Sequence, residues 1–171
     1  MPNEMDDIIA EAKALMIQVK RKAYCHFLMA ESASRKNLTL GIFVTLFSSI
    51  VGTTIFTAMA EKDTGPRPHD TQLWIQIGTG LMSLAAAVLA GFQTFFHFNE
   101  NAQVNKNAAT NYEKVGRHLD IFLLTYLPDT GKRTEGLAEY KLIMDELQKV
   151  KESSPTVPNV FYNKAVAKHP D

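Results

Sequence analysis

Two long stretches without charged residues dominate the hydrophobic pattern of the chain. The first is LTLGIFVTLFSSIVGTTIFTAMA at residues 38–60, and the second is LWIQIGTGLMSLAAAVLAGFQTFFHF at residues 73–98, with its histidine taken as neutral. Each exceeds the roughly 20 residues that a helix needs to cross about 30 Å of hydrocarbon. The pattern predicts two transmembrane helices, joined as a hairpin by the short loop at 61–72.

Outside these stretches the pattern becomes amphipathic, with apolar residues recurring every three or four positions. The stripes are Ile8, Ala12, Leu15, Val19, Ala23 and Phe27, then Ala108, Tyr112, Val115, Leu119, Phe122 and Tyr126, and finally Leu137, Tyr140, Met144 and Leu147. Three apolar stripes are most economically buried against each other, so we expect a cytoplasmic helical bundle. The N-terminal helix, which carries several lysines, could instead lie on the membrane surface.

These patterns predict an all-α membrane protein, a two-helix transmembrane hairpin with a cytoplasmic helical bundle. The expected order is an N-terminal cytoplasmic amphipathic helix (1–37), transmembrane helix 1 (38–60), a short extracytoplasmic loop (61–72), transmembrane helix 2 (73–98), a cytoplasmic helical hairpin (99–154) and a proline-containing C-terminal segment (155–171). The polar run SASRKN at 32–37 is expected to form a hinge at the membrane surface. Prolines in SSPTVP stop the last helix, and the segment beyond either packs on the bundle through Val157, Val160, Phe161 and Tyr162 or forms a docking tail.

The positive charges predict the orientation in the membrane. The chain has 18 Lys and Arg against 18 Asp and Glu, so its net charge does not indicate an orientation, and only the positions of the basic residues do. The basic residues near the spans are Lys20, Arg21, Lys22, Arg35 and Lys36 before the first, Lys106, Lys114 and Arg117 after the second, and only Lys62 and Arg67 between them. Both termini are therefore expected in the cytoplasm. The acidic start, MPNEMDDIIAEAKAL, lacks the pattern of a cleavable signal peptide, so the first span is expected to be retained.

Catalytic and metal-binding patterns are absent from the sequence. The five histidines are scattered, without the spacing of a metal site, and no phosphate-binding glycine loop, CxxC pair or nucleophile motif occurs. The single cysteine, Cys25, has no partner in the chain and is expected to be a buried thiol rather than a reactive one. We expect no enzyme activity, no cofactor, no metal and no nucleic-acid partner.

The first span has an unusual series of hydroxyl groups. Thr45, Ser49, Thr53 and Thr57 recur every four residues, and the opposite surface is assigned to Ile42, Phe43, Leu46, Phe47, Ile50 and Phe56. The second span has a comparable stripe of small and polar residues, Gln76, Gly80, Ser83, Ala87, Gly91 and Thr94. Small residues and hydroxyls serve close helix packing, and they also line aqueous paths. The four hydroxyl residues are thus candidate pore-lining positions.

A pore formed by two-helix chains requires several copies, because two helices cannot enclose a lumen. We expect a homo-oligomer, with a tetramer favoured, and take Tyr112, Val115, Leu119 and Phe122 as candidate contacts between protomers. Glu61 and Asp63 at the outer end and Glu100 at the inner end would favour cations if repeated in a ring. The more ordinary interpretation is that they are solvated charges beside the spans.

The order of elements resembles a known family. A basic helix leads through Tyr24 and His26 to RKNLTLGIFVTLFSSIVGTTIF, and a second span runs into FFHFNENAQVNKNAATNYEKVGRHLDIFL before the closing SPTVPNVFYNKA. This arrangement resembles the SLATT superfamily of two-transmembrane proteins, which accompany nucleotide-second-messenger synthetases and SLOG sensor domains in bacterial conflict systems. The resemblance implies a membrane effector that oligomerises and permeabilises the bacterial inner membrane on infection. A separate nucleotide-second-messenger system or sensor protein is then a candidate partner.

The leading hypothesis is an oligomeric, pore-forming or ion-channel-like effector of antiviral defence. The alternative is a non-conducting membrane anchor or regulator whose cytoplasmic bundle binds a partner sensor or enzyme. A membrane enzyme is the weakest hypothesis, because no nucleophile, metal site or acid and base pair gathers near the spans.

Overall fold

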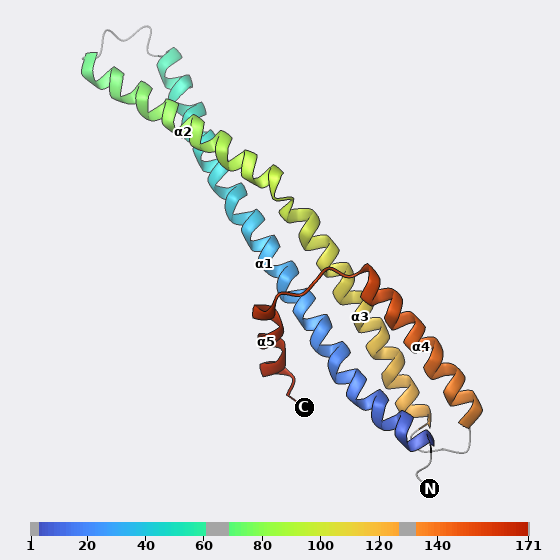
Figure 1. The fold of residues 1–171 in the computed structure, drawn as a ribbon. Coiled ribbons are helices and arrows are strands. Elements are labelled where there is room, and N and C mark those ends of the chain that lie inside the picture. Colours follow the sequence, from blue (N-terminus) through green and yellow to red (C-terminus); the bar gives the residue numbers. More distant parts are fainter. Residues whose placement is uncertain (1–3, 61–68, 127–132, 171) are drawn as a thin grey trace. The chain divides into compact units, whose positions relative to one another are not determined.

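The computed structural model describes residues 4–60, 69–126 and 133–170, which form five α-helices (Figure 1). They are α1 (Glu4–Ala60), α2 (His69–Phe95), α3 (Phe98–Tyr126), α4 (Arg133–Ser153) and α5 (Asn159–Lys168). The described part of the chain contains no strand, so the all-α prediction is confirmed for it. The chain divides into two compact units, a bundle unit (Met1–Ser32 and Glu100–Asp171) and a hairpin unit (Ala33–Asn99).

The core of the bundle unit is made by the amphipathic stripes of α1, α3 and α4. Its buried side chains include Ile9, Val19, Val115, Leu119, Phe122, Tyr140, Ile143 and Leu147. The Phe122 ring contacts the Tyr140 ring, with their centroids 5.6 Å apart, and Gly116 of α3 lies close to Val19 of α1. Each helix therefore covers the apolar face of its neighbours, as the 3.6-residue period requires.

Polar contacts border this core and fix the register of its helices. Lys20 of α1 pairs with Asp120 of α3 at 3.7 Å, and the Tyr126 hydroxyl donates to Glu139 of α4 at 2.9 Å. Burial and the negative charge of Glu11 raise the pKa of Tyr140 to about 12, so this core tyrosine stays protonated at neutral pH.

The short helix α5 packs against α1. Pro158 stands at its N-cap with φ −65° and ψ 145°, the extended conformation that precedes a helix start. Arg21 Nε donates to the carbonyl of His169 at 2.7 Å, and the Tyr24 and His169 rings meet edge to face at 5.7 Å. Ala165 is fully buried, whereas Val160 is 65% exposed. The C-terminal segment thus packs on the bundle unit, but through Ala165 and polar contacts rather than through Val160.

Two local predictions differ from the structure. Residues 32–37 are helical within α1, because the run contains no Gly or Pro to break a helix and Thr39 donates back to the Arg35 carbonyl at 2.9 Å. A break does occur where none was expected, at residues 96–97 between α2 and α3, where His97 has φ 45°. This left-handed conformation is uncommon for a residue other than glycine, and apolar periodicity carries no sign of it.

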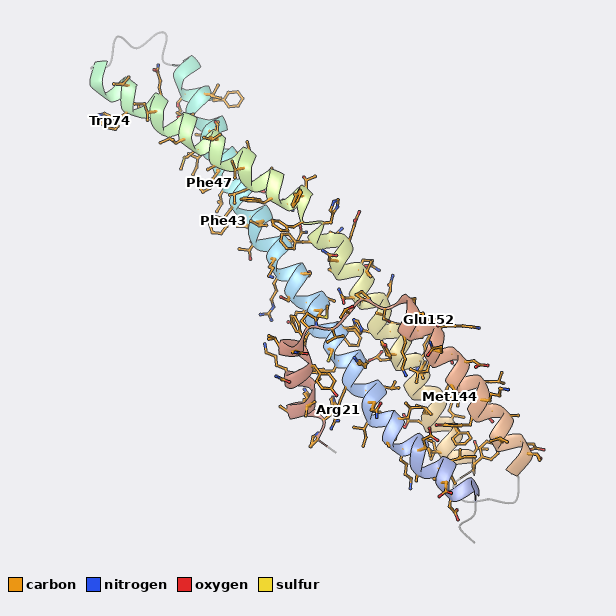
Figure 2. All side chains as sticks on the ribbon, in the orientation of Figure 1. Arg21, Phe43, Phe47, Trp74, Met144 and Glu152 are labelled. Carbon is orange, nitrogen blue, oxygen red and sulfur yellow. The ribbon has the colours of Figure 1, made fainter. Side chains whose placement is uncertain are left out.

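The hairpin unit exposes most of its apolar side chains. α1 and α2 are each long and apolar enough to cross a membrane. Large side chains such as Phe56 (76% exposed), Trp74 (71%) and Leu84 (63%) lie on its outside, and Figure 2 shows Trp74 near the start of α2. A contiguous exposed apolar surface of this kind is typical of a region that contacts lipid or another protein. The two apolar helices could therefore span a membrane.

Candidate functional site

The hydroxyl series of α1 is satisfied by its own helix. Thr45 donates to the Gly41 carbonyl at 2.9 Å, Ser49 to the Thr45 carbonyl at 2.8 Å, and Thr53 to the Ser49 carbonyl at 2.9 Å. Thr57 donates to the Thr54 carbonyl at 3.0 Å. Each hydroxyl proton is thus used locally, while the oxygen keeps lone pairs that can accept a bond from water or another chain.

The opposite side of α1 makes the contact with α2. The half-buried positions of α1 in the hairpin unit include Asn37, Leu40, Gly41, Val44, Phe47, Val51, Gly52 and Thr54. The buried and half-buried positions of α2 recur at the same spacing and include Ile75, Thr79, Met82, Ala85, Ala86, Leu89 and Gln93. Gln93 Nε2 donates to Asn37 Oδ1 at 2.9 Å, which ties the two helices together. The hairpin is therefore closed by a seam that does not include the hydroxyl series.

Both small and polar stripes face outward from the hairpin unit. The hydroxyl residues Thr45, Ser49, Thr53 and Thr57 are exposed, and so are Gln76, Gly80, Ser83, Ala87, Gly91 and Thr94 of α2. Packing between the two helices of one chain therefore does not account for either stripe. What they contact lies outside a single chain: lipid, water or a second copy.

The expected division of α1 into a polar and an apolar side needs correction. Phe47 does face α2 and is half-buried, but Leu46 is 52% exposed on the outward side. At 100° per residue, Leu46 lies only about 20° from Thr53 around the helix axis. Ile42 and Phe56 are likewise exposed among the hydroxyl residues. The outward face alternates hydroxyls with large apolar groups, so any lumen that it bordered would be partly apolar.

The residues assigned to protomer contacts require a second correction. Tyr112, Val115, Leu119 and Phe122 are between 0% and 4% exposed, inside the core of their own chain. Two elements of the same chain cover their stripe, α4 and the N-terminal part of α1. In this conformation these four side chains offer no surface to another protomer.

The charges proposed for the pore mouths are only partly visible. Glu61 and Asp63 lie outside the residues that the structure describes. Glu100 is exposed in the first turn of α3, where a carboxylate favourably opposes the positive end of the helix dipole. Its position therefore has an ordinary structural explanation as well.

The bundle unit holds a buried polar cluster that the sequence patterns did not single out. His26 is 1% exposed, its Nδ1 lies 3.0 Å from Asn105 Oδ1, and its ring stacks on Tyr112 with centroids 5.5 Å apart. Asn105 Nδ2 donates to the Asn101 carbonyl at 2.8 Å, so Oδ1 is the acceptor and His26 Nδ1 carries the proton. His26 lies three residues after Ala23, and Asn105 lies three residues before Ala108, so both continue the apolar stripes of their helices. This spacing is the sequence feature that indicates their burial.

Burial lowers the pKa of His26. The hydrogen bond that His26 donates to Asn105 opposes this shift, and the positive charge of Lys22 adds to it. Cys25 beside it is also buried, with Sγ 3.6 Å from the Phe161 carbonyl, and burial raises the pKa of its thiol. The cluster is therefore neutral at physiological pH, and it holds α1, α3 and α5 together rather than presenting a reactive group.

We expect the bundle unit to lose stability as the pH falls below about 6.5, the ordinary pKa of histidine. A lowered folded-state pKa means that the unfolded chain binds the proton first, so protonation favours unfolding. The midpoint of thermal unfolding should be lower at pH 5.5 than at pH 7.5 in the parent. In His26→Gln this difference should shrink, and an unchanged difference would contradict the assignment.

No group of three or more His, Cys, Asp or Glu side chains suited to a metal ion occurs within residues 4–60, 69–126 and 133–170. No family model matches the sequence, and no curated protein or solved structure matches the chain.

Proposed function

We propose that the chain is an oligomeric membrane pore or channel-like effector. The observation that carries this proposal is the outward exposure of Thr45, Ser49, Thr53 and Thr57, opposite the seam that closes the hairpin. A helix that faced only lipid would gain little from four hydroxyls, whereas a ring of copies would place them against each other or against water. The exposed small-residue stripe of α2 supports the same arrangement, because it allows close approach of a neighbouring helix.

The resemblance to SLATT proteins supplies the biological part of the proposal. The effector belongs to bacterial antiphage defence, resides in the inner membrane and permeabilises it when triggered. A separate sensor or nucleotide-second-messenger system provides the trigger. The local hydrogen bonds of the hydroxyl series favour the competing function, a non-conducting anchor or regulator, because they satisfy the donors without any lumen.

The test is ion flux through vesicles reconstituted with the purified chain. Dye-loaded liposomes with the protein should leak on an imposed ion gradient, and protein-free liposomes should not. The same preparation should have the mass of a homo-oligomer, with a tetramer favoured, after the detergent contribution is subtracted. A monomer at every accessible concentration would remove the pore, and an oligomer that never conducts would leave the anchor function in its place.

The orientation of the chain is proposed from its positive charges, with both termini in the cytoplasm. A single cysteine, Thr64→Cys in a Cys25→Ala background, should react with a membrane-impermeant maleimide added outside sealed bacterial spheroplasts. A cysteine at the N-terminus, Asn3→Cys in the same background, is the matched control and should react only after lysis. The reverse pattern would overturn the orientation.

A further inference from the structure

The bundle unit contains a cavity of about 270 Å³ bordered by α1, α3, α4 and α5. Its apolar part is formed by Val19 and Leu147, and the Tyr162 ring of α5 stands at its edge. None of the residues that line it belongs to the hairpin unit, so the cavity is separate from the hydroxyl series proposed to line the pore.

Three positive side chains converge on this cavity, Arg21 and Lys22 from α1 and Lys151 from the last turn of α4, and among the described residues no carboxylate lines it. Arg21, labelled in Figure 2, is 7% exposed, and it donates a hydrogen bond to the His169 carbonyl. Lys22 Nζ lies 5.6 Å from the centre of the Tyr162 ring, which is a cation–π contact. Within the described residues neither Lys22 nor Lys151 has a carboxylate within ion-pair distance.

Charges of one sign gathered around a concave surface repel each other, and a bound anion would relieve that repulsion. A single carboxylate would offset only one of the two lysines, Lys22 and Lys151, whereas a phosphate monoester carries a charge of about −1.5 to −2 and three acceptor oxygens. Arg and Lys are the side chains that proteins use for phosphate. The apolar wall and the tyrosine ring then suit a small organic body attached to the phosphate.

We propose that this cavity binds a small organic phosphate, supplied either by a soluble metabolite or by the headgroup of an anionic phospholipid. The volume of about 270 Å³ lies just below the roughly 300–1,000 Å³ typical of ligand pockets, so the ligand is of the size of one phosphate group with a few carbon atoms. Bound ligand would bridge α1, α4 and α5 and so stabilise the packing of α5. The site goes beyond the proposed pore and does not rest on it.

The test uses the full chain in an uncharged detergent and two probes. Glycerol 3-phosphate is titrated by calorimetry, and retention of phosphatidylglycerol is measured by native mass spectrometry. The double variant Lys22→Gln with Lys151→Gln should weaken one or both by about tenfold or more. The matched control, Lys13→Gln with Lys149→Gln, removes two exposed lysines from the same two helices but outside the cavity, and should bind like the parent.

A loss of glycerol 3-phosphate binding in the cavity variant alone supports a soluble ligand, and a loss confined to phosphatidylglycerol supports a lipid headgroup. Binding of neither probe by the parent would overturn the proposal. Equal losses in the two double variants would also overturn it, because the effect would then be one of net charge. Near-ultraviolet circular dichroism of the tyrosines checks that both variants keep the fold, since all five tyrosines lie in the bundle unit.

Discussion

Replacing Phe122 with alanine should destabilise the bundle unit by about 3–5 kcal/mol, the usual cost of removing a phenylalanine side chain from a packed core. Phe122 is fully buried, and its ring lies against Tyr126 and Tyr140, with centroids 5.1 Å and 5.6 Å away. Alanine would remove both ring contacts and leave a cavity between α3 and α4. Few single substitutions elsewhere in the described chain remove so much packed surface.

The two units can be followed separately in this experiment. All five tyrosines lie in the bundle unit, and the single tryptophan, Trp74, lies in the hairpin unit. In a urea titration of the full chain in detergent, the tyrosine circular dichroism should therefore lose its signal at lower urea in Phe122→Ala. The tryptophan fluorescence should change much less.

The matched control for this prediction is Leu124→Ala. Leu124 lies on the same helix but is 77% exposed, so its removal should change the free energy of unfolding by only about 0.5 kcal/mol. If Phe122→Ala is as stable as this control but has a lower oligomer mass, Phe122 joins protomers as its sequence position suggested. The core described here would then be wrong.

The sequence patterns predict the helices well, but they do not predict which helices pack against one another. The apolar period around Tyr112 and Leu119 correctly indicates a buried face, yet periodicity does not say which element buries it. In this chain the face is buried by α4 and by the N-terminal part of α1. The predicted contact between protomers therefore falls on a surface that the chain's own helices cover. Identifying the neighbour requires knowing which residues far apart in sequence meet, as His26 and Asn105 do across 79 positions.

Local backbone chemistry explains the other differences. The polar run at 32–37 suggests a hinge in the sequence, but without Gly or Pro a polar run in a helix stays helical. The prolines of SSPTVP correctly indicated the end of α4, whereas α5 after them has a weak apolar period that gave little basis for predicting it. The turn at His97 has no composition signal at all, since it depends on one residue adopting a positive φ.

The candidate site shows the same limit. Spacing alone grouped Thr45, Ser49 and Thr53 on one face, and the structure places them together on the outward side of α1. Spacing also assigned Leu46 to the opposite side, although a stripe at four-residue intervals winds around the helix by about 40° per step and passes close to that residue. A helix face defined by four-residue steps therefore includes apolar residues, such as Leu46, as well as the hydroxyl residues that define it.

The largest functional effect is expected from Ser49→Leu combined with Thr53→Leu. Both residues are exposed on the outward face, and both hydroxyls bond only to carbonyls of their own helix, so the double variant should retain the helix and the seam with α2. In an oligomer that conducts along this face, Leu46 already makes the path partly apolar, and two further leucines per chain would narrow it. A narrow apolar constriction excludes water and so blocks the passage of ions. Flux should fall to the level of protein-free liposomes, with expression and oligomer mass unchanged.

The matched control makes the same chemical change on the other span, Ser83→Leu with Thr94→Leu. These residues are also exposed, and Thr94 also donates to its own helix, at 3.0 Å to the Ala90 carbonyl. If α1 lines the path, this pair should conduct like the parent whenever its oligomer mass is unchanged, because leucines at a helix contact alter assembly rather than the lining of the path. If instead the α2 pair abolishes flux and the α1 pair does not, the path runs along Gln76, Gly80, Ser83 and Ala87, and the hydroxyl series of α1 serves helix packing alone.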